Sequence, residues 1–516
     1  MSHQVLVAGA GPTGLTLALD LARRGVAVRI VDRATAYFAG SRGDGIQPRT
    51  LEVFDDLGVL GRVLAEGRTA PVMRAYFAGE FAGERRMSEP VDPTPDVPQP
   101  NPWVLGQSRT EAALRDRLAG FGVRPELGTA VTAVAQDTAG VTATLSRDGA
   151  HETVRVDYLV GADGGASTVR KRLGIPFEGR TDESVRMLLG DVRADGLDHE
   201  FGYWFAADPD RPMDGIALTP LPGGRHFQFA APFDADTDSG AHPTLDDLQQ
   251  RLNRHAGRTD LALSELTWIT VWRPNIRLAA RFRDGRVFLA GDAAHVHPPT
   301  GGQGLNTGIQ DAYNLGWKLA AALHGDPAPL DTYEPERRAV AARVLGLSTE
   351  LLDRLVDGAA DALERGPETR QLDISYRSPA DAGALVAGDR APDAPLLDER
   401  GRGVRLFDLF RGPHATLLVF GGTGSPNGTG PAGPVPRPGA AFAPSHRART
   451  AGLPAAADHD AGTGRTGEVR VVRVVRPGGP ATGAYVDAEG HAFTAYAAED
   501  GTRILIRPDG HLASRS

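Results

Sequence analysis

The first 33 residues constrain the fold more than any other part of the sequence, because they have the pattern of a strand, a tight turn, a helix and a second strand. Residues 5–8 are an unbroken apolar run, which is typical of a buried parallel strand. Leu15 and Leu19 recur at helical spacing before Gly25 ends the helix, and residues 27–31, which are apolar apart from Arg29, form a second strand-like run. This β-α-β order predicts an α/β fold around a parallel sheet.

The turn between the first strand and the helix has the pattern G-x-G-x-x-G. Its glycines permit a tight turn and let backbone amides approach a pyrophosphate at the positive end of the helix dipole. Asp32 ends the second strand, where a carboxylate can accept hydrogen bonds from ribose hydroxyls; the alternative is a solvated strand end. We predict a dinucleotide site that comprises Gly9, Gly11, Pro12, Thr13, Gly14, Asp32 and Arg33.

Charge and composition exclude several classes of protein. A formal net charge of −9 argues against a nucleic-acid-binding protein, which usually carries an excess of basic residues. The absence of cysteine rules out disulfides, thiolate metal sites and dithiol redox chemistry, so any electron transfer needs a bound cofactor. No apolar run approaches the ~18 residues of a membrane span, and residues 1–4 lack the charge of a signal peptide. We expect a cytoplasmic protein that contacts neither membrane nor nucleic acid.

Two further glycine-containing motifs follow strand-like runs later in the chain. Residues 161–167 read Gly-Ala-Asp-Gly-Gly-Ala-Ser, with the aspartate directly after a strand. Residues 291–295 read Gly-Asp-Ala-Ala-His, and the loop at 301–306 reads Gly-Gly-Gln-Gly-Leu-Asn. His295 and His297 could suggest a metal site, but no carboxylate or third histidine stands at matching spacing, so we predict no metal.

With these three motifs in this order, the chain resembles the class A flavoprotein monooxygenases. These are single-component FAD hydroxylases related to p-hydroxybenzoate and phenol hydroxylases and to aromatic polyketide hydroxylases of actinomycetes. The resemblance covers essentially the whole chain. It implies FAD as bound cofactor, NADPH or NADH as reductant, and molecular oxygen as co-substrate. The implied reaction is hydroxylation of an aromatic or polyketide-derived substrate through a flavin C4a-hydroperoxide.

The resemblance also implies roles for particular residues. Asp292 corresponds to the carboxylate that holds the FAD ribityl chain, and Asp163 to a residue that serves both FAD and NADPH. Arg42 belongs to a Ser-Arg pair that reaches towards the pyrophosphate and flavin, Gln107 lies near the ribityl chain, and Pro298 backs the flavin ring. The remaining expected cofactor-binding residues are Gly291, Gly301, Gly302, Gly304, Leu305 and Asn306.

Several of these assignments have alternatives. Arg42 could be a surface ion-pair residue, and Gln107 a polar residue at a helix start. A helix after Gly304 would direct its free amides at the pyrimidine end of the flavin, where negative charge develops on reduction. The sequence identifies no acid–base residue.

The sequence divides into an FAD-binding first part (1–176), an inserted mixed β-sheet domain for substrate (177–277), a helical second part of the FAD-binding domain (278–387) and a C-terminal domain (388–516). The resemblance implies a Rossmann-like FAD-binding domain, similar to that of p-hydroxybenzoate hydroxylase, with these two additions. The C-terminal domain resembles the thioredoxin-like domain of phenol hydroxylase, although it has no cysteine for dithiol exchange. We expect a structural role or an assembly surface, for instance of a homodimer.

Other functions on this scaffold remain open at the level of sequence. The same scaffold could act as a Baeyer–Villiger oxygenase or an antibiotic-inactivating monooxygenase. A flavin-dependent halogenase would carry a W-x-W-x-I-P motif, whereas Trp268 and Trp272 are separated by three residues. A catalytically silent flavin-binding scaffold is the alternative from a different class, and the intact Asp163 and Asp292 argue against it.

Overall fold

A five-stranded, largely parallel sheet forms the centre of the protein, which confirms the α/β prediction. The computed structural model describes residues 3–182, 185–233, 243–298, 300–356, 364–378, 380–383, 385–421, 467–479 and 482–516. The strand order is β19-β20-β11-β1-β2, and β19 runs antiparallel to its neighbour. The strands are β1 (Val5–Ala8), β2 (Val28–Val31), β11 (Tyr158–Gly161), β19 (Arg283–Asp284) and β20 (Val287–Leu289).

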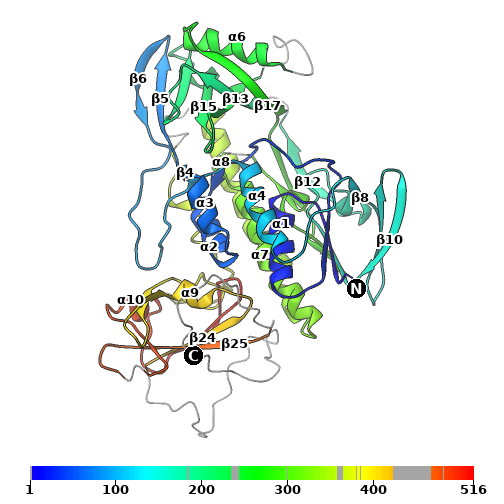
Figure 1. Cartoon of the computed structure of the whole chain (residues 1–516), viewed down its shortest axis with the longest axis vertical. Helices are drawn as coiled ribbons and strands as arrows, with labels where there is room; N and C mark the ends of the chain where they lie inside the picture. The colour runs from blue at the N-terminus through cyan, green and yellow to red at the C-terminus, as the bar shows by residue number, and fades with distance from the viewer. Residues whose placement is uncertain are drawn as a thin grey trace.

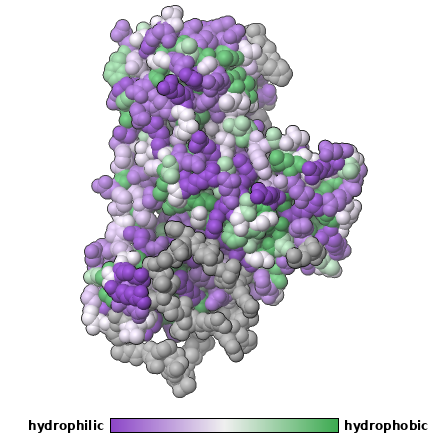
Figure 2. Space-filling view, viewed as in Figure 1, coloured by the Kyte–Doolittle hydropathy of each residue, from purple (hydrophilic) through white to green (hydrophobic). Residues whose placement is uncertain are grey.

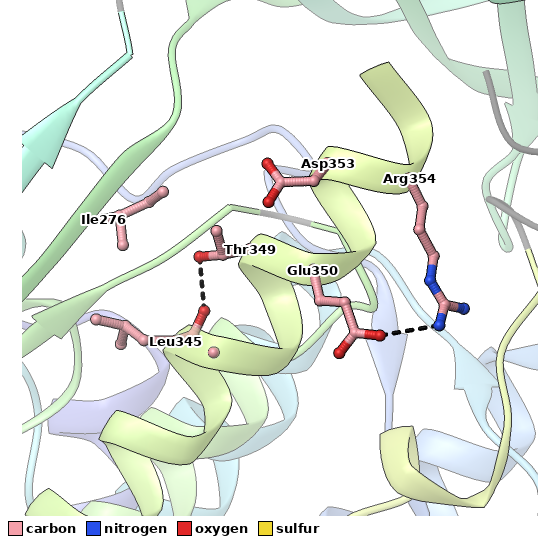
Figure 3. A pocket seen from close by; sticks show the side chains of 7 residues that line it. Ile276, Leu345, Thr349, Glu350, Asp353 and Arg354 are labelled. Carbon is pink, nitrogen blue, oxygen red and sulfur yellow. Dashed lines mark hydrogen bonds and ion pairs between the residues drawn. The ribbon is translucent and has the colours of Figure 1, made fainter. Parts of the chain in front are cut away.

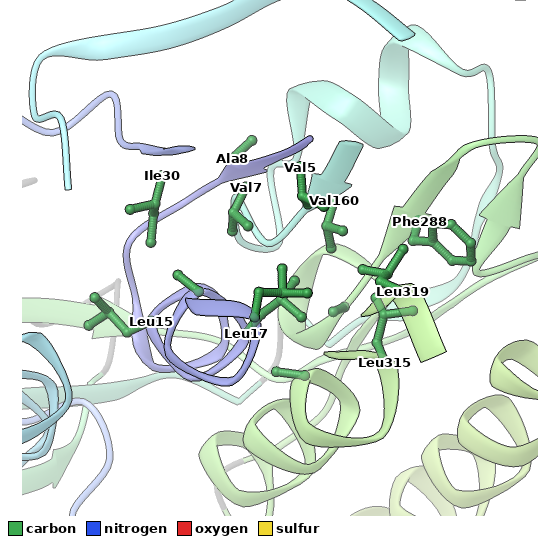
Figure 4. Close-up of a cluster of buried hydrophobic side chains, with 14 of the residues drawn as sticks. Val5, Val7, Ala8, Leu15, Leu17, Ile30, Val160, Phe288, Leu315 and Leu319 are labelled. Carbon is green, nitrogen blue, oxygen red and sulfur yellow. The ribbon is translucent and has the colours of Figure 1, made fainter. Parts of the chain in front are cut away.

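Helices α1 (Pro12–Arg23) and α7 (Gly304–Leu323) pack against this sheet and against each other (Figure 1). Figure 4 shows Val7 and Val160 of the sheet in one apolar cluster with Leu17 of α1 and Leu315 of α7, all with 0% exposure. Burial of each such side chain contributes about 1.5–3 kcal/mol. Helix α4 (Gln107–Ala119) packs on α1, and α8 (Tyr333–Val356) packs on α7.

Smaller elements surround this centre. One antiparallel sheet contains β8 (Thr129–Gln136), β9 (Val141–Arg147) and β10 (Ala150–Val156); a second contains β3 (Gly45–Ile46), β4 (Arg68–Thr69) and β7 (Trp103–Val104). A third contains β12 (Phe177–Thr181), β18 (Asn275–Ala279) and β21 (His295–Val296). Short helices are α2 (Pro48–Asp56), α3 (Leu60–Glu66) and α5 (Thr168–Arg172), and 3-10 turns are η1 (Pro212–Asp214), η2 (Gly291–Ala293), η3 (Ala328–Thr332) and η4 (Pro367–Thr369).

A separate seven-stranded sheet forms the upper part of the molecule in Figure 1. Its order is β17-β13-β16-β15-β14-β5-β6. One face packs on α6 (Leu245–Ala256) and buries Val192 and Phe229 with Leu252 of the helix. The strands are β5 (Val72–Phe77), β6 (Glu80–Arg85), β13 (Met187–Asp195), β14 (Phe201–Ala206), β15 (Ile216–Pro220), β16 (His226–Pro232) and β17 (Ala262–Trp272).

This sheet does not follow the predicted boundary at residue 177. Strands β5 and β6 come from the segment that the sequence assigned to the FAD-binding part, and β5 pairs in parallel with β14 from residue 72 to 77. The chain therefore enters the seven-stranded sheet before returning to α4. A boundary drawn from local composition misses this pairing, because it joins residues about 130 positions apart. Such long-range pairing is possible because the free-energy cost of closing a loop rises only slowly with its length.

The C-terminal part has its own sheet and its own apolar core, at the bottom of Figure 1. The strand order is β23-β22-β26-β25-β24-β27-β28. Its thioredoxin-like classification stays a prediction, and the glycine-rich stretch 422–466 lies outside the described residues. The elements are β22 (Pro395–Leu397), β23 (Gly403–Arg405), α9 (Leu406–Phe410), β24 (Ala415–Phe420), β25 (Val469–Val475), β26 (Tyr485–Val486), α10 (His491–Ala495), β27 (Arg503–Ile506) and β28 (Leu512–Arg515).

The surface is mixed in character. Figure 2 shows hydrophilic side chains over much of the face in view, with apolar side chains in scattered groups. Within the described ranges, no helix is both long and apolar enough to cross a membrane.

Buried charged side chains join the C-terminal part to helices α7 and α8. Arg507 donates to Glu336 of α8 at 2.7 Å, and Lys318 of α7 donates to the same carboxylate at 2.7 Å. Arg507 also donates to Asp509 at 2.5 Å. Burial lowers the pKa of Lys318 to about 8. Burial alone would raise the pKa of Glu336, but the charges of Arg507 and Lys318 lower it to about 2.

A second buried cluster joins the C-terminal part to α2. Glu52 pairs with Arg49 at 2.6 Å and with Arg390 from the C-terminal part, and all three are at most 9% exposed at their side chains. Arg49 also donates to the backbone oxygen of Asp509 at 2.8 Å. Removal of the C-terminal part would take Arg390 away from Glu52 and the Asp509 backbone oxygen away from Arg49. We therefore expect such a truncation to lower stability, since a buried charge that loses a partner is costly.

The Arg507 cluster generates a direct test. We expect Arg507→Met to lower the free energy of unfolding by about 3–5 kcal/mol, because it leaves Asp509 and Glu336 buried with too few donors. Urea denaturation of the full chain measures this. Arg155→Met, which removes an exposed pair with Asp137, is the control and should change stability little. Equal effects of the two substitutions would contradict the role of the buried cluster.

Candidate cofactor and substrate site

The turn after β1 needs glycine at two positions for steric reasons. Gly9 has φ +108°, and a Cβ there would lie 2.1 Å from the backbone oxygen of Ala162. A Cβ at Gly14 would lie 1.9 Å from the backbone oxygen of Gly9. At Gly11, the N-cap residue of α1, a Cβ would meet no described atom within 4 Å. The open side of the turn therefore lies at the helix start, where backbone amides can bind a pyrophosphate.

Asp32 holds this turn in place. Its carboxylate accepts hydrogen bonds from the backbone N–H of Ala10 at 2.7 Å and of Ala34 at 2.8 Å. A carboxylate has about four acceptor positions, so it keeps capacity for a ribose hydroxyl. Arg33 beside it is exposed. The arrangement fits the ribose of a bound dinucleotide such as FAD.

The Gly-Asp motif at residues 291–295 lies against this turn. Gly291 has φ +60°, and a Cβ there would lie 2.5 Å from Thr13 Oγ1. A Cβ at Gly308 of α7 would lie 2.4 Å from the same oxygen. Thr13 is thus enclosed by two glycines that are 295 and 278 residues away in the chain. Asp292 follows Gly291 directly and is thereby carried to the start of α1.

The Asp292 residue is accessible to solvent, although many protein atoms lie around its carboxylate. Burial by those atoms raises its pKa, while the charges of His295 and Arg42 act in the opposite direction. An accessible carboxylate in such a partly desolvated position is suited to accept hydrogen bonds from ligand hydroxyls. This fits the role that the sequence predicts, contact with the ribityl chain of FAD.

A buried network fixes the backbone next to Asp292. The backbone N–H of Gly291 donates to Asp311 Oδ2 at 3.0 Å, and His295 Nε2 lies 2.6 Å from the same oxygen. Arg337 of α8 donates to the other oxygen at 2.7 Å. Burial would raise the pKa of Asp311, but His295 and Arg337 lower it. His295 is therefore engaged within the protein.

The loop before α7 is held by Asn306. Its side-chain oxygen accepts from the backbone N–H of Gln47 at 2.8 Å, and its nitrogen donates to the backbone oxygens of Gly45 and Gly302. Gly301 and Gly302 both have positive φ, at 86° and 62°. The loop can therefore turn sharply into the helix.

Helix α7 begins at Gly304, where the sequence predicts a helix start. Its first turn contains Leu305 and Asn306, has no acidic residue and has no side-chain hydrogen bond at its N-cap within the described ranges. Such an N-terminus favours a negatively charged group. Pro298 is buried, and its backbone oxygen lies 3.0 Å from His297 Nδ1. Burial lowers the pKa of His297 to about 4, so this ring is neutral near neutral pH.

Arg42 and Gln107 approach the same region from two other segments. Arg42 is exposed and stacks over the ring of Phe38, at 4.6 Å from its centroid. Its charge acts on both Asp292 and Glu111. Gln107 begins α4 and donates to Glu111 at 2.8 Å. Arg42 therefore lies within electrostatic range of Asp292, while Gln107 is hydrogen-bonded within its own helix.

Asp163 has a local structural role. Its carboxylate accepts from the hydroxyl of Ser167 at 2.5 Å and from the backbone N–H of Thr168 at 2.7 Å and of Val169 at 3.2 Å. These bonds satisfy the N-terminal amides of α5. The nucleotide contact that the resemblance implies for Asp163 stays a prediction.

Two carboxyl groups near Arg42 were not identified from the sequence. Burial raises the pKa of Asp191 on β13 to about 6, and it also raises the pKa of Asp44. The sequence signal for Asp191 was an acidic residue within the otherwise apolar run 187–192. Asp44 gave no comparable signal, because it lies in a polar loop.

A surface pocket of about 500 Å³ lies between β18 and α8. Figure 3 shows Ile276 of β18 facing Leu345, Thr349 and Asp353 of α8. The neighbouring turns of α8 contact the segment just before the loop at 301–306, since Thr300 donates to the backbone oxygen of Ser348 at 2.7 Å. The pocket is thus beside α8, and we assign it no ligand.

Comparison with known proteins agrees with this geometry. A family described as "FAD binding domain" matches residues 2–348, which is about two thirds of the chain. A protein of Mycobacteroides abscessus named "Flavin-dependent monooxygenase" is 49% identical over 429 residues, covering 81% of this chain and 88% of that protein. The chain belongs to this family of FAD-dependent monooxygenases.

Other relatives have more specific names. The "12-dehydrotetracycline 5-monooxygenase/anhydrotetracycline 6-monooxygenase" of Streptomyces rimosus is 36% identical over 456 residues, covering 82% of this chain and 86% of that protein. The crystal structure of "a ternary complex of aklavinone-11 hydroxylase with FAD and aklavinone" has a TM-score of 0.76 at 27% identity, covering 100% of this chain and 96% of that one.

The open side of Gly11 gives a test of the pyrophosphate position. We expect Gly11→Ala to leave the stability of the FAD-free protein unchanged but to weaken FAD binding by at least about tenfold, or ~1.4 kcal/mol, because the methyl group blocks close backbone approach. FAD fluorescence titration measures the affinity. Gly61→Ala in α3 is the matched control, since a Cβ there also meets no described atom within 4 Å. Equal FAD affinity of both variants would place the phosphates elsewhere.

Asp292 gives a second test. We expect Asp292→Ala to weaken FAD binding greatly, because each ligand hydroxyl left unpaired in the site costs about 1–3 kcal/mol. The ratio of flavin to protein after purification measures the effect, and Asp137→Ala at an exposed position is the control. Full FAD occupancy in folded Asp292→Ala protein would refute the assignment.

Proposed function

We propose that the protein hydroxylates an aromatic, polyketide-derived small molecule and uses FAD, NADPH or NADH, and molecular oxygen. The observation that supports this most is the face of the seven-stranded sheet that α6 does not cover. This face carries a mixture of apolar and polar side chains beside the loop that contains Ser41 and Arg42. Support also comes from the relatives that are named for tetracycline intermediates and for aklavinone.

The two faces of the sheet differ because side chains alternate along a strand. On β13, Leu188 and Val192 have 0% exposure and pack on the α6 side. Leu189 and Asp191 point to the other face, where Leu189 is only half-buried and pairs with Thr270 of β17. A partly apolar surface that also offers polar groups suits a planar ring system.

The residues of this chain divide the work in the proposed reaction. The turn at Gly9–Gly14 and Asp292 bind the cofactor, and the start of α7 stabilises negative charge near it. When bound, FAD supplies the redox chemistry by accepting two electrons from the nicotinamide and activating oxygen. The seven-stranded sheet orients the substrate ring and excludes water.

The nicotinamide nucleotide would bind without a domain of its own. The sequence has no second G-x-G-x-x-G pattern between a strand and a helix. We place the nucleotide in a surface groove near Arg42 and Asp163, where exposed Arg42 can contact a phosphate. Contacts in such a groove are brief, so a substrate-controlled step before hydride transfer protects against futile oxidation of the nucleotide.

Substrate control of reduction tests this function. We expect flavin bleaching by NADPH to be slow alone and to rise at least about tenfold with a suitable phenolic polyketide, a change of about 1.4 kcal/mol in barrier. Stopped-flow absorbance measures the rates, and mass spectrometry with labelled oxygen identifies the product. A ring-expanded ester would instead indicate Baeyer–Villiger chemistry. Fast reduction that a hydroxylated compound leaves unchanged would contradict the gating.

A further inference from the structure

The loop that carries Arg42 lies against the substrate sheet. Trp268 of β17 closes over Gly40 so tightly that a Cβ there would lie 1.9 Å from the Trp268 ring. The Phe38 ring meets the Trp268 ring edge to face, with centroids 5.6 Å apart. Gln228 of β16 donates a hydrogen bond to the backbone oxygen of Ser41. The loop is therefore held at Phe38, Gly40 and Ser41.

Asp191 lies between these two contacts. In the strand register it stands opposite Gln228 of β16 on one side and opposite Trp268 of β17 on the other. Asp191 is only 3% exposed, and its Oδ1 and the Trp268 Nε1 have no hydrogen-bond partner among the described residues. Ser41 is close enough for its N–H and O–H to lower the pKa of Asp191, which burial raises.

The burial of Asp191 indicates that its carboxylate holds the loop rather than binds substrate directly. A residue that binds substrate directly would be accessible from the half-buried face, as Leu189 on the same strand is. Asp191 is instead covered by the loop at Ser41, which is itself 4% exposed. A buried carboxylate without a full set of donors is costly, so the nearby N–H and O–H groups of Ser41, which lower the pKa of Asp191, favour the position of the loop over it.

We propose that Asp191, Gln228 and Trp268 form a clamp by which the substrate sheet sets the position of Arg42. Arg42 follows Ser41 directly, and its charge acts on Asp292 at the cofactor site. A ligand on the sheet face would touch the strands that carry the clamp, so its binding reaches Arg42 through Ser41. The functional part of this inference rests on the proposed function, whereas the mechanical part does not.

A spin label on the loop tests the clamp directly. The chain has no cysteine, so Gly43→Cys provides a single labelling site. A Cβ at Gly43 would have ordinary contacts of 3.7 Å with Leu305. In the FAD-loaded protein, we expect Gln228→Ala and Asp191→Ala to increase the mobility of the label in its electron paramagnetic resonance spectrum. Asp191→Asn retains an acceptor oxygen and should restore the immobile spectrum.

Gln249→Ala is the matched control. Gln249 on α6 also donates from its side chain to a backbone oxygen, that of Leu261 at 2.9 Å, but on the opposite side of the sheet. It should leave the label immobile. An immobile label in both Gln228→Ala and Asp191→Ala overturns the clamp. If Asp191→Ala does not fold, Gln228→Ala alone decides, because Gln228 is only half-buried.

Reduction kinetics without the label test the functional part. We expect Gln228→Ala to speed ligand-free flavin reduction by about fivefold, the effect of one lost hydrogen bond, and to reduce the stimulation by substrate equally. Gln249→Ala should keep the parent rates. A mobile label with unchanged reduction would overturn the coupling but not the clamp. A parent protein without substrate-dependent reduction would contradict the proposed function, and the spectra would still decide the clamp.

Discussion

The buried carboxylate of Asp311 is the interaction on which the cofactor half of the structure depends. It receives the backbone N–H of Gly291, the guanidinium of Arg337 and the ring of His295. A carboxylate removed from water is tolerated when several donors surround it, and the loss of one donor is then costly. This carboxylate fixes the end of β20, helix α7 and helix α8 relative to one another. Asp292 is thereby held near the start of α1.

The same principle explains how the C-terminal part is attached to helices α7 and α8. Helix α7 is buried on all sides over most of its length, including Asn314 and Lys318. A polar stripe of this kind usually faces solvent on a surface helix. Here Glu336 of α8 pairs with Lys318, and Asp509 of the C-terminal part accepts from Asn314 at 3.2 Å. Helix α7, whose N-terminus the sequence predicts to face the cofactor, thus depends on a distant part of the chain for its polar partners.

The seven-stranded sheet is connected to this framework by a different interaction. One face is closed by α6 through apolar contacts, and the other receives the loop that contains Ser41 and Arg42. Gly40 is required there because the Trp268 ring occupies the space of any side chain. The loop therefore belongs to both halves of the molecule, since it follows β2 of the central sheet and rests on β16 and β17.

The sequence by itself determined the β-α-β unit, the glycine turn at Gly9–Gly14 and the start of α7, because each depends on residues within about 20 positions. Only the tertiary structure decided that β5 joins β14, that Asp163 caps α5, and that Asp191 lies beneath the Arg42 loop. Motif matching places a residue near a site but does not show which donors its side chain meets. Those partners come from strands and helices far apart in the chain, and their pairing is set by packing in three dimensions.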